Sequence, residues 1–195
     1  MSNTTNITEI IHNRRSIKPQ EFNGKIIDRS DIDQLIEAAD WAPTHGRTEP
    51  WRFIIFDSEG IKRFCQDHAD LYKANTDPDK FIEASYDKFK NQGDLASHVI
   101  AVFCKRGPKP GIALQEEICA TAAAVQNILL TAESKGIASF WSTGGQILKP
   151  SMKKYFQLLE EDVMIGVIYL GYTDKEKTEG KRLTPLEEKI MWYHR

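Results

Sequence analysis

One segment constrains the fold of this chain more than any other. The run from Leu114 to Lys135 has the length of a long helix, and Gly136 follows it in the position that commonly ends helices. Its middle, from Ala120 to Leu130, is apolar on nearly every side, and a helix with such a surface is buried. We therefore expect a central helix that is covered on both faces, by the rest of the chain and by a partner subunit.

The bulk properties exclude several classes of protein. The 195 residues fit one domain of ordinary size, and a net charge of -2 is not that of a nucleic-acid binder. No apolar run approaches the roughly 18 residues that span a bilayer. Three widely spaced cysteines and five scattered histidines make no metal-ligand pair and no disulfide framework. This pattern favours a reducing cytoplasm, with Cys104 and Cys119 as buried, inert thiols.

Hydrophobic periodicity predicts a mixture of helices and strands, and hence one α+β domain. Strands are expected at 51–56, 97–104, 138–141 and 163–170, and a turn at 57–60 is expected to close the first. Further helices are expected at 7–11, 30–39, 61–73, 79–91 and 151–158. From about residue 172 the tail is polar, and either a capping box formed by Thr184 and Glu187 or an extended arm fits it.

A basic cluster near the N-terminus is the first candidate site. Arg14, Arg15, Ser16 and Lys18 lie within five residues of a nearly neutral chain. Arginine forks bind phosphate oxygens in a bidentate way, so the cluster suggests one discrete anionic ligand. The alternative is that the arginines are solvated residues at the end of a helix, where their positive charge interacts favourably with the helix dipole. Two other basic pairs, at 62–63 and 105–106, are expected to be solvated charge.

Two loops are the other candidates. The loop at 44–51 is expected to be rigid, because two prolines, Pro43 and Pro50, and Gly46 fix it. His45 in this loop is either a ligand contact or a satisfied surface histidine, and Trp51 behind it is expected to anchor the core. The turn at 142–145 ends in Gly144 and Gly145, and glycines let a ligand approach main-chain N–H groups.

The chain lacks the usual catalytic machinery. It has no G-x-S-x-G, no P-loop lysine motif, no G-x-G-x-x-G after the first strand and no C-x-x-C. An enzyme made of these parts would have no obvious nucleophile or acid–base pair. That gap suits an enzyme whose cofactor carries the chemistry while the protein positions it.

Three ordered motifs resemble the FMN-dependent nitroreductase family. They are the basic cluster at 13–18, the loop at 42–53 with its Pro-x-His-Gly-x-x-x-Pro-Trp pattern, and the segment at 136–144 followed by the glycines at 166 and 171. The resemblance implies one nitroreductase-like FMN-binding domain over residues 1–195, with a C-terminal arm from about 172. It also implies a mostly antiparallel sheet flanked by helices, and a homodimer with the long helix at its interface.

The resemblance also implies roles for particular residues. Arg14, Arg15 and Ser16 would bind the FMN phosphate and the pyrimidine edge, and Lys18 would lie near N1 and O2 of the flavin. A loop of the other subunit would close over the cofactor, and it carries Trp41, Pro43, Thr44 and His45. Trp141, Ser142 and Thr143 would lie along the flavin ring, with a main-chain N–H at Thr143 or Gly144 donating to N5. Arg182, or its neighbour Lys181, would reach the phosphate.

The activity that this resemblance implies is transfer of hydride through the flavin, with no catalytic side chain and no metal. NADH or NADPH would reduce the flavin, and a nitroaromatic, quinone or related small molecule would then take the electrons. Thr143 stands where many family members have an acidic residue, so substrate range does not carry over. A flavin- or nucleotide-binding module with little turnover, and a reductase for one metabolite, stay open as alternatives.

Overall fold

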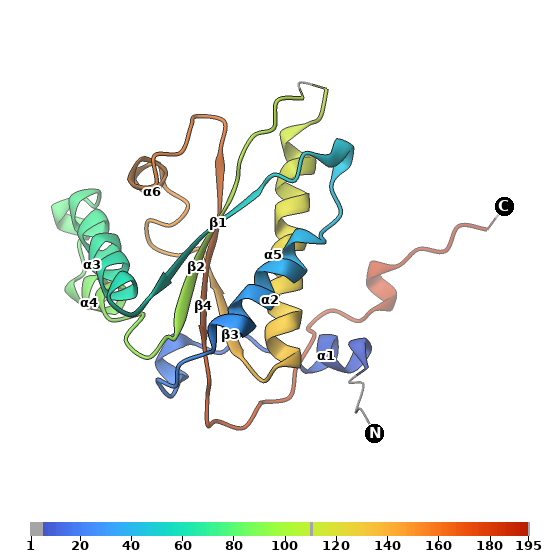
Figure 1. Ribbon diagram of the computed structural model, residues 1–195, viewed down its shortest axis with the longest axis horizontal. Coiled ribbons are helices and arrows are strands. Elements are labelled where there is room, and N and C mark those ends of the chain that lie inside the picture. Colours follow the sequence, from blue (N-terminus) through green and yellow to red (C-terminus); the bar gives the residue numbers. More distant parts are fainter. Residues whose placement is uncertain (1–5, 110, 195) are drawn as a thin grey trace.

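The computed structural model describes residues 6–109 and 111–194, and it contains one sheet with helices on both faces (Figure 1). The strands are β1 (Trp51–Asp57), β2 (His98–Cys104), β3 (Ala138–Ser142) and β4 (Val163–Gly171). They lie in the order β1-β2-β4-β3, and each neighbouring pair is antiparallel. The predicted α+β fold with an antiparallel sheet is therefore confirmed.

The two central strands, β2 and β4, are buried on both faces. Successive side chains of a strand point to opposite sides, so each strand supplies two cores. Ile100 of β2 and Ile168 of β4 belong to the core on one side, whereas Val99 and Tyr169 belong to the core on the other. This explains why both strands are nearly continuous apolar runs in the sequence.

The helices form a layer on each side of the sheet (Figure 1). One layer consists of α2 (Arg29–Asp40) and α5 (Leu114–Ser134), and the other of α3 (Ser58–Ala74), α4 (Glu83–Lys90) and α6 (Pro150–Tyr155). The short α1 (Ile7–Asn13) lies against α5. Four single 3₁₀ turns complete the chain: η1 (Pro19–Glu21), η2 (His45–Arg47), η3 (Pro78–Lys80) and η4 (Glu187–Lys189).

The central helix α5 has one side that residues 6–109 and 111–194 leave uncovered. Ala124, Val125 and Ile128 are fully buried between α2 and the sheet. On the opposite side Cys119 and Gln126 are exposed, which makes the prediction of a buried Cys119 wrong. A helix whose surface is apolar on every side is therefore not buried on every side by its own chain.

Three predicted boundaries were wrong. The turn expected at 57–60 does not exist, because α3 begins at Ser58 directly after β1. The helix expected at 79–91 is divided into η3 and α4 by extended backbone at Phe81 and Ile82. The helix expected at 151–158 ends at Tyr155. In the last two cases the pattern of polar and apolar residues continued beyond the hydrogen-bonded helix, whereas in the first the helix begins earlier than its apolar pattern.

The C-terminal segment is an arm that leaves the body of the protein (Figure 1). Its first residues are fixed: Thr173 donates its hydroxyl to the Glu21 carbonyl at 2.6 Å, and Lys175 pairs with the Glu21 carboxylate at 2.8 Å. From residue 181 to 194 every side chain is exposed. The arm is extended, with η4 as its one turn within the described residues, so the capping-box alternative at Thr184 was wrong.

Within the part of the chain that the structure describes, no helix is both long enough and apolar enough to cross a membrane.

Candidate functional site

A cavity of about 580 Å³ lies at the edge of the sheet where β3 ends, and we call it the glycine-turn cavity. That volume falls in the range of small-molecule and cofactor sites. Three segments line it: residues 18–20, the end of α4 with Gln92, and residues 140–144. Lys18, Trp141, Ser142, Thr143 and Gly144 are therefore gathered in one place, as the sequence predicted for these five.

The basic cluster reaches this cavity because its backbone docks on the edge strand β3. Ser16 forms a parallel bridge with Ser139, and the Ile17 N–H donates to the Ser139 carbonyl at 3.0 Å. Pro19 then begins η1 and prevents a helix from continuing through Lys18. The Lys18 side chain is exposed at the cavity wall, so its ammonium is available to an anionic ligand.

Trp141 is fixed in the wall by a β-bulge in the neighbouring strand β4. The register between β2 and β4 shifts after Val102, next to Gly166, and a bulge re-aims local groups. The Ile165 carbonyl accepts the Trp141 indole N–H at 3.1 Å. A Cβ at Gly166 would lie 2.1 Å from the Trp141 indole nitrogen, so the glycine makes room for the ring. The indole is 37% exposed and lines the cavity.

The two glycines of the turn have different surroundings. Gly145 has a φ of +62°, and a Cβ there would lie 2.6 Å from the His68 ring and 2.8 Å from Phe89. Gly144 has ordinary backbone, and a Cβ there would meet no atom within 4 Å. The fold therefore requires glycine at 145 but not at 144. Gly144 leaves bare backbone on the cavity wall, where a flat ligand can approach the main chain.

The arginines of the cluster do not line the cavity. Arg15 uses its guanidinium within the fold: Nη1 donates to the carbonyls of His12 at 2.6 Å and Arg14 at 2.9 Å, and Nε donates to that of Thr178 at 2.9 Å. This side chain therefore attaches the arm to the end of α1. Arg14 is half-buried, and Arg182 is exposed on the arm.

Three further predicted residues lie around a second hollow of about 420 Å³, which we call the α5 cleft. Pro43, Thr44 and His45 form one wall, and the exposed side of α5 forms the other. The α5 wall consists of Gln115, Glu116, Cys119, Ala120 and Ala123. Trp41 lines neither hollow and is 82% exposed at the end of α2.

His45 is held on the cleft by a carboxylate. Its Nδ1 lies 2.5 Å from the Glu116 Oε2, and this hydrogen bond lowers the pKa of the Glu116 carboxyl. The loop behind it is braced by the Thr44 and Thr48 hydroxyls, 3.1 Å apart, and by Lys109, which donates to the Gly46 carbonyl. The rigid loop that the prolines and glycine predicted is thus cross-linked by hydrogen bonds.

A buried ion pair that was not predicted lies beneath the cleft. Arg106 was expected to be solvated, but its Nη1 lies 2.5 Å from the Glu117 Oε2 and its Nη2 donates to the Ile112 carbonyl at 2.6 Å. The Glu117 side chain is 1% exposed and also accepts the Gly107 N–H at 3.1 Å. This network attaches the 105–113 loop to the first turn of α5.

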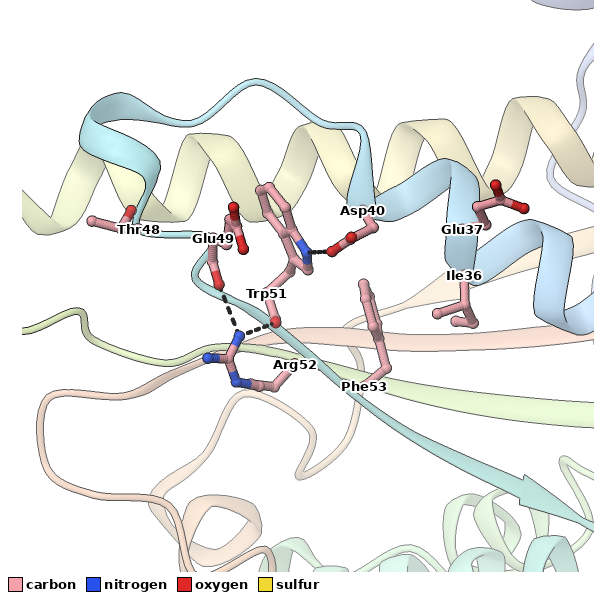
Figure 2. A pocket seen from close by; sticks show the side chains of 8 residues that line it. All are labelled: Ile36, Glu37, Asp40, Thr48, Glu49, Trp51, Arg52 and Phe53. Atoms are coloured by element: carbon pink, nitrogen blue, oxygen red, sulfur yellow. Dashed lines mark hydrogen bonds between the residues drawn. The ribbon is translucent and has the colours of Figure 1, made fainter.

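A third hollow, of about 380 Å³, lies between α2 and the start of β1 and contains no predicted site residue (Figure 2). Trp51 is 4% exposed there and donates its indole N–H to Asp40 at 2.9 Å, which confirms it as a core anchor. Arg52 donates to the carbonyls of Glu49 and Trp51 (Figure 2). Figure 2 shows that the first bond ties the start of β1 to the end of α2, whereas the Arg52 bonds stay within residues 49–52. Across the described residues, no cluster of His, Cys, Asp and Glu could hold a metal ion.

Eight of the predicted site residues thus divide between two hollows that share no lining residue, and the other five line neither: Arg14, Arg15, Ser16, Trp41 and Arg182. The sheet is four-stranded and antiparallel, a long helix lies across one face, and a cavity lies where the edge strand meets the N-terminal segment. This arrangement is the nitroreductase fold. The structure of a nitroreductase-like family protein from Bacillus cereus matches it with a TM-score of 0.82 and 28% identity, covering 100% of both chains.

The profile of the Nitroreductase family matches residues 11–172, and the chain belongs to this family. A Bacillus subtilis protein named "Putative NAD(P)H nitroreductase YfhC" is 30% identical over 185 residues, which cover 94% of this chain and 92% of that protein. The structure of a nitroreductase with bound FMN from Bacteroides fragilis has the same fold, with a TM-score of 0.71 and 22% identity over 98% of this chain and 100% of that one.

Proposed function

We propose that the protein is an FMN-dependent oxidoreductase that uses NADH or NADPH to reduce nitroaromatic, quinone or related electrophilic acceptors. The observation that carries the proposal is the glycine-turn cavity, because it combines a cation, aromatic walls and bare backbone in one hollow. Membership of the family supports it, and so do relatives named as NAD(P)H nitroreductases.

The residues of the cavity fit a flavin. The Trp141, Phe140 and Phe89 rings offer apolar surface to a flat aromatic ligand. Gly144 leaves space that a side chain would occupy, so ring atoms can reach the main-chain N–H groups of the turn. Lys18 supplies positive charge at the wall, which would stabilise the negative charge of a reduced flavin.

When bound, the flavin would supply the hydride chemistry, and this chain would supply orientation and charge. Trp141 would hold one face of the site, since its own donor is engaged by Ile165. Thr143 and Gly144 would present backbone to the ring, and Lys18 would favour the anionic form. Arg14, Ser16 and Arg182 would bind the phosphate, while Arg15 would act mainly by attaching the arm beside it.

We further propose that the whole chain acts as one FMN-binding domain in a homodimer, with the α5 cleft of one subunit completing the cavity of the other. The separation of the two hollows within one chain supports this, since the loop at 43–45 cannot cover the cavity beside Lys18 in the same chain. The arm offers apolar side chains for a second copy to bury. Exposed ones are Leu183, Leu186, Met191, Trp192 and Tyr193, and Trp41 and Ile11 add others on the body.

The first experiment is an FMN titration. The purified protein should take up FMN, and NADH or NADPH should bleach the flavin absorption. Steady NAD(P)H oxidation with a nitroaromatic or quinone would then separate an enzyme from a binding module with little turnover. A protein that takes up no FMN would end the proposal, and bound FMN without turnover over a broad acceptor panel would favour the binding module.

The second experiment tests the shared site by complementation. Gly144→Leu should fill the cavity, and His45→Trp should block the cleft. Little effect on either subunit's fold is expected, because a Cβ at Gly144 meets no atom within 4 Å and the contact that His45 would lose, with Glu116, is at the surface. Each homodimer should lose FMN. A heterodimer purified through two different tags should contain one intact site and one doubly blocked site, so it should bind about half the wild-type FMN. A heterodimer with no FMN would mean that each site lies within one chain.

A reductase for one metabolite is the remaining alternative within the family. A relative named 5,6-dimethylbenzimidazole synthase, from Rhodobacter capsulatus, is 29% identical over 143 residues, which cover 67% of this chain. The acceptor panel separates the two, since a generalist should reduce many acceptors at comparable rates and a specific enzyme should not.

A further inference from the structure

One buried polar side chain behind the glycine turn has no part in the functions described so far. His68 lies on α3 and is 1% exposed. Its Nε2 accepts the Gln146 N–H at 3.1 Å. A neutral imidazole has one acceptor nitrogen and one donor nitrogen, so the proton lies on Nδ1. Among the described residues, no group accepts a hydrogen bond from this Nδ1.

The ring is packed tightly between the core and the cavity wall. It stacks on Phe89, with ring centroids 4.7 Å apart, and the Phe89 side chain lines the glycine-turn cavity. On the other side the Phe64 ring centroid is 6.1 Å away. Gly145 lies so close that a Cβ there would be 2.6 Å from Nε2. His68 therefore touches both the turn and an aromatic wall of the cavity, without reaching the cavity itself.

Packing alone does not explain a histidine at this position. Leucine or phenylalanine would fill the core without the cost of burying a polar ring whose second nitrogen has no partner. What histidine adds is an acceptor for the Gln146 amide, which lies at a buried residue of the turn. The Gln146 side chain is engaged separately, since it accepts the Ser151 hydroxyl at 2.7 Å. Accepting the hydrogen bond from the Gln146 main-chain N–H is thus what a histidine, and not an apolar residue, contributes at position 68.

We propose that His68 is a positioning residue for the cofactor site: its Nε2 fixes the 144–146 turn so that the backbone of Thr143 and Gly144 meets a flavin in the cavity. The inference rests on the proposed function for the identity of the ligand. On this inference α3 helps to shape the site although His68 does not line the cavity, because His68 acts on the turn through its contacts with Gln146 and Gly145.

The test compares three variants of the full-length protein. His68→Leu removes the acceptor, and His68→Gln restores one at a similar reach. His98→Leu is the matched control, because His98 is also buried, on β2, but its hydrogen bond joins Nδ1 to the Ser97 hydroxyl at 2.9 Å, whereas that of His68 joins Nε2 to the Gln146 amide of the turn. If the leucine variant does not fold at the assay temperature, His68→Phe takes its place, since it keeps the stacked ring and still lacks an acceptor.

Two readouts are needed. The first is hydrogen exchange of the Gln146 amide in cofactor-free protein, which should be about tenfold faster in His68→Leu and close to wild type in His68→Gln and His98→Leu. The second is FMN affinity, measured by flavin fluorescence, together with the visible circular dichroism of the bound flavin. His68→Leu should bind FMN about tenfold more weakly with an altered spectrum, and His68→Gln should recover most of both.

Each outcome decides one question. Unchanged exchange at Gln146, or unchanged FMN affinity and spectrum, in a folded His68→Leu protein would overturn the inference. An equal loss of affinity in His98→Leu would also overturn it, because the effect would then be general destabilisation. If wild-type protein takes up no FMN, the proposed function fails instead. Wild-type uptake with no effect of His68→Leu would leave the proposed function standing and remove only the role of His68.

Discussion

The glycine-turn cavity and the α5 cleft present different chemistry to a ligand. In the cavity the key positions are backbone and rings, and the groups that fix them are buried: Trp141 is held by a β-bulge and the turn by His68. In the cleft the functional groups are side chains, and His45 and Glu116 are 63% and 45% exposed. The first region is a rigid seat, whereas the second is a surface that a ligand or a partner would have to cover.

The cavity and the cleft are also held in shape by different parts of the fold. The cavity takes its shape from the core of the sheet and the α3 layer, so it exists in one chain. The cleft takes its shape from two loops: the Arg106–Glu117 pair attaches one of them to the first turn of α5, and the bond from Lys109 to the Gly46 carbonyl joins that loop to the other. Changes below the cleft should therefore affect stability, while changes on its surface should affect binding.

The largest effect is expected at the buried ion pair. Glu117→Ala leaves the Arg106 guanidinium without its carboxylate in a largely buried position, and breaking such a pair costs about 3–5 kcal/mol of unfolding free energy. Urea denaturation monitored by circular dichroism measures the loss. The double variant Arg106→Met, Glu117→Leu is the control, since it removes both charges and should recover much of the stability. A single variant as stable as wild type would show that the loops do not depend on this pair.

The second effect is a loss of stability at acid pH, caused by His68 behind the glycine-turn cavity. Burial lowers the pKa of His68 from 6.5 to about 4, so between these values the unfolded chain binds more protons than the folded one. Stability from the neutral ring is therefore complete above pH 6.5 and is lost as pH falls toward about 4. The loss would be about 3 kcal/mol, the free energy of a shift of this size. Denaturation at several pH values should show it in wild type and much less in His68→Leu.

His98 is the internal reference for that experiment. Burial also lowers its pKa, but the Asp57 carboxylate partly opposes the shift. His98→Leu should therefore remove a smaller part of the acid sensitivity. A result in which removal of His98 abolished the sensitivity and removal of His68 did not would contradict the environment described for these two rings.

The third effect separates the two glycines of the turn. Gly145→Ala should cost about 1–3 kcal/mol, because the residue has a positive φ and its Cβ would press on His68 and Phe89. Gly144→Ala should leave unfolding unchanged, since the added methyl group faces open space, but should weaken FMN binding. Thermal denaturation and an FMN titration of both variants measure this. Equal stability of the two would show that the turn has a different backbone in solution.

These comparisons also show what the sequence could predict. Periodicity identified all four strands, because β2 and β4 are continuous apolar runs and β1 and β3 are bounded by Pro50 and Gly136. It could not show that α3 starts immediately at Ser58, since polar residues begin helices as well as turns. The exposure of Cys119 was missed because alanine-rich sequence on α5 describes both the core side and the uncovered side.

Prediction of the candidate site was limited because local sequence does not show which side chains the fold will bury or pair. The resemblance carried by the three ordered motifs predicted that Lys18 and the 141–144 segment belong to one site, and both segments line the same cavity. Nothing local distinguishes Arg15, which holds the arm, from Arg14 beside it. Glu117 and His68 were not found, since one charged residue in a helix and one histidine in an amphipathic helix look like surface residues until the fold buries them.

The smallest effect on stability is expected on the surface of the cleft. Glu116→Gln keeps an oxygen that can accept from His45 but removes the charge, and exposed ion pairs contribute little because water and salt screen them. The His45 contact lowers the pKa of Glu116, so its contribution is present above the ordinary carboxyl pKa of 4.5 and is lost as pH falls below it. We therefore expect the denaturation midpoint at neutral pH to be unchanged, in both low and high salt. FMN affinity should nevertheless fall if the cleft covers the cofactor of a second subunit, because a neutral amide holds the His45 ring less firmly than the carboxylate does. A large loss of stability in this variant would mean that the cleft side chains hold the fold together, and the contrast between a rigid seat and an open surface would be wrong.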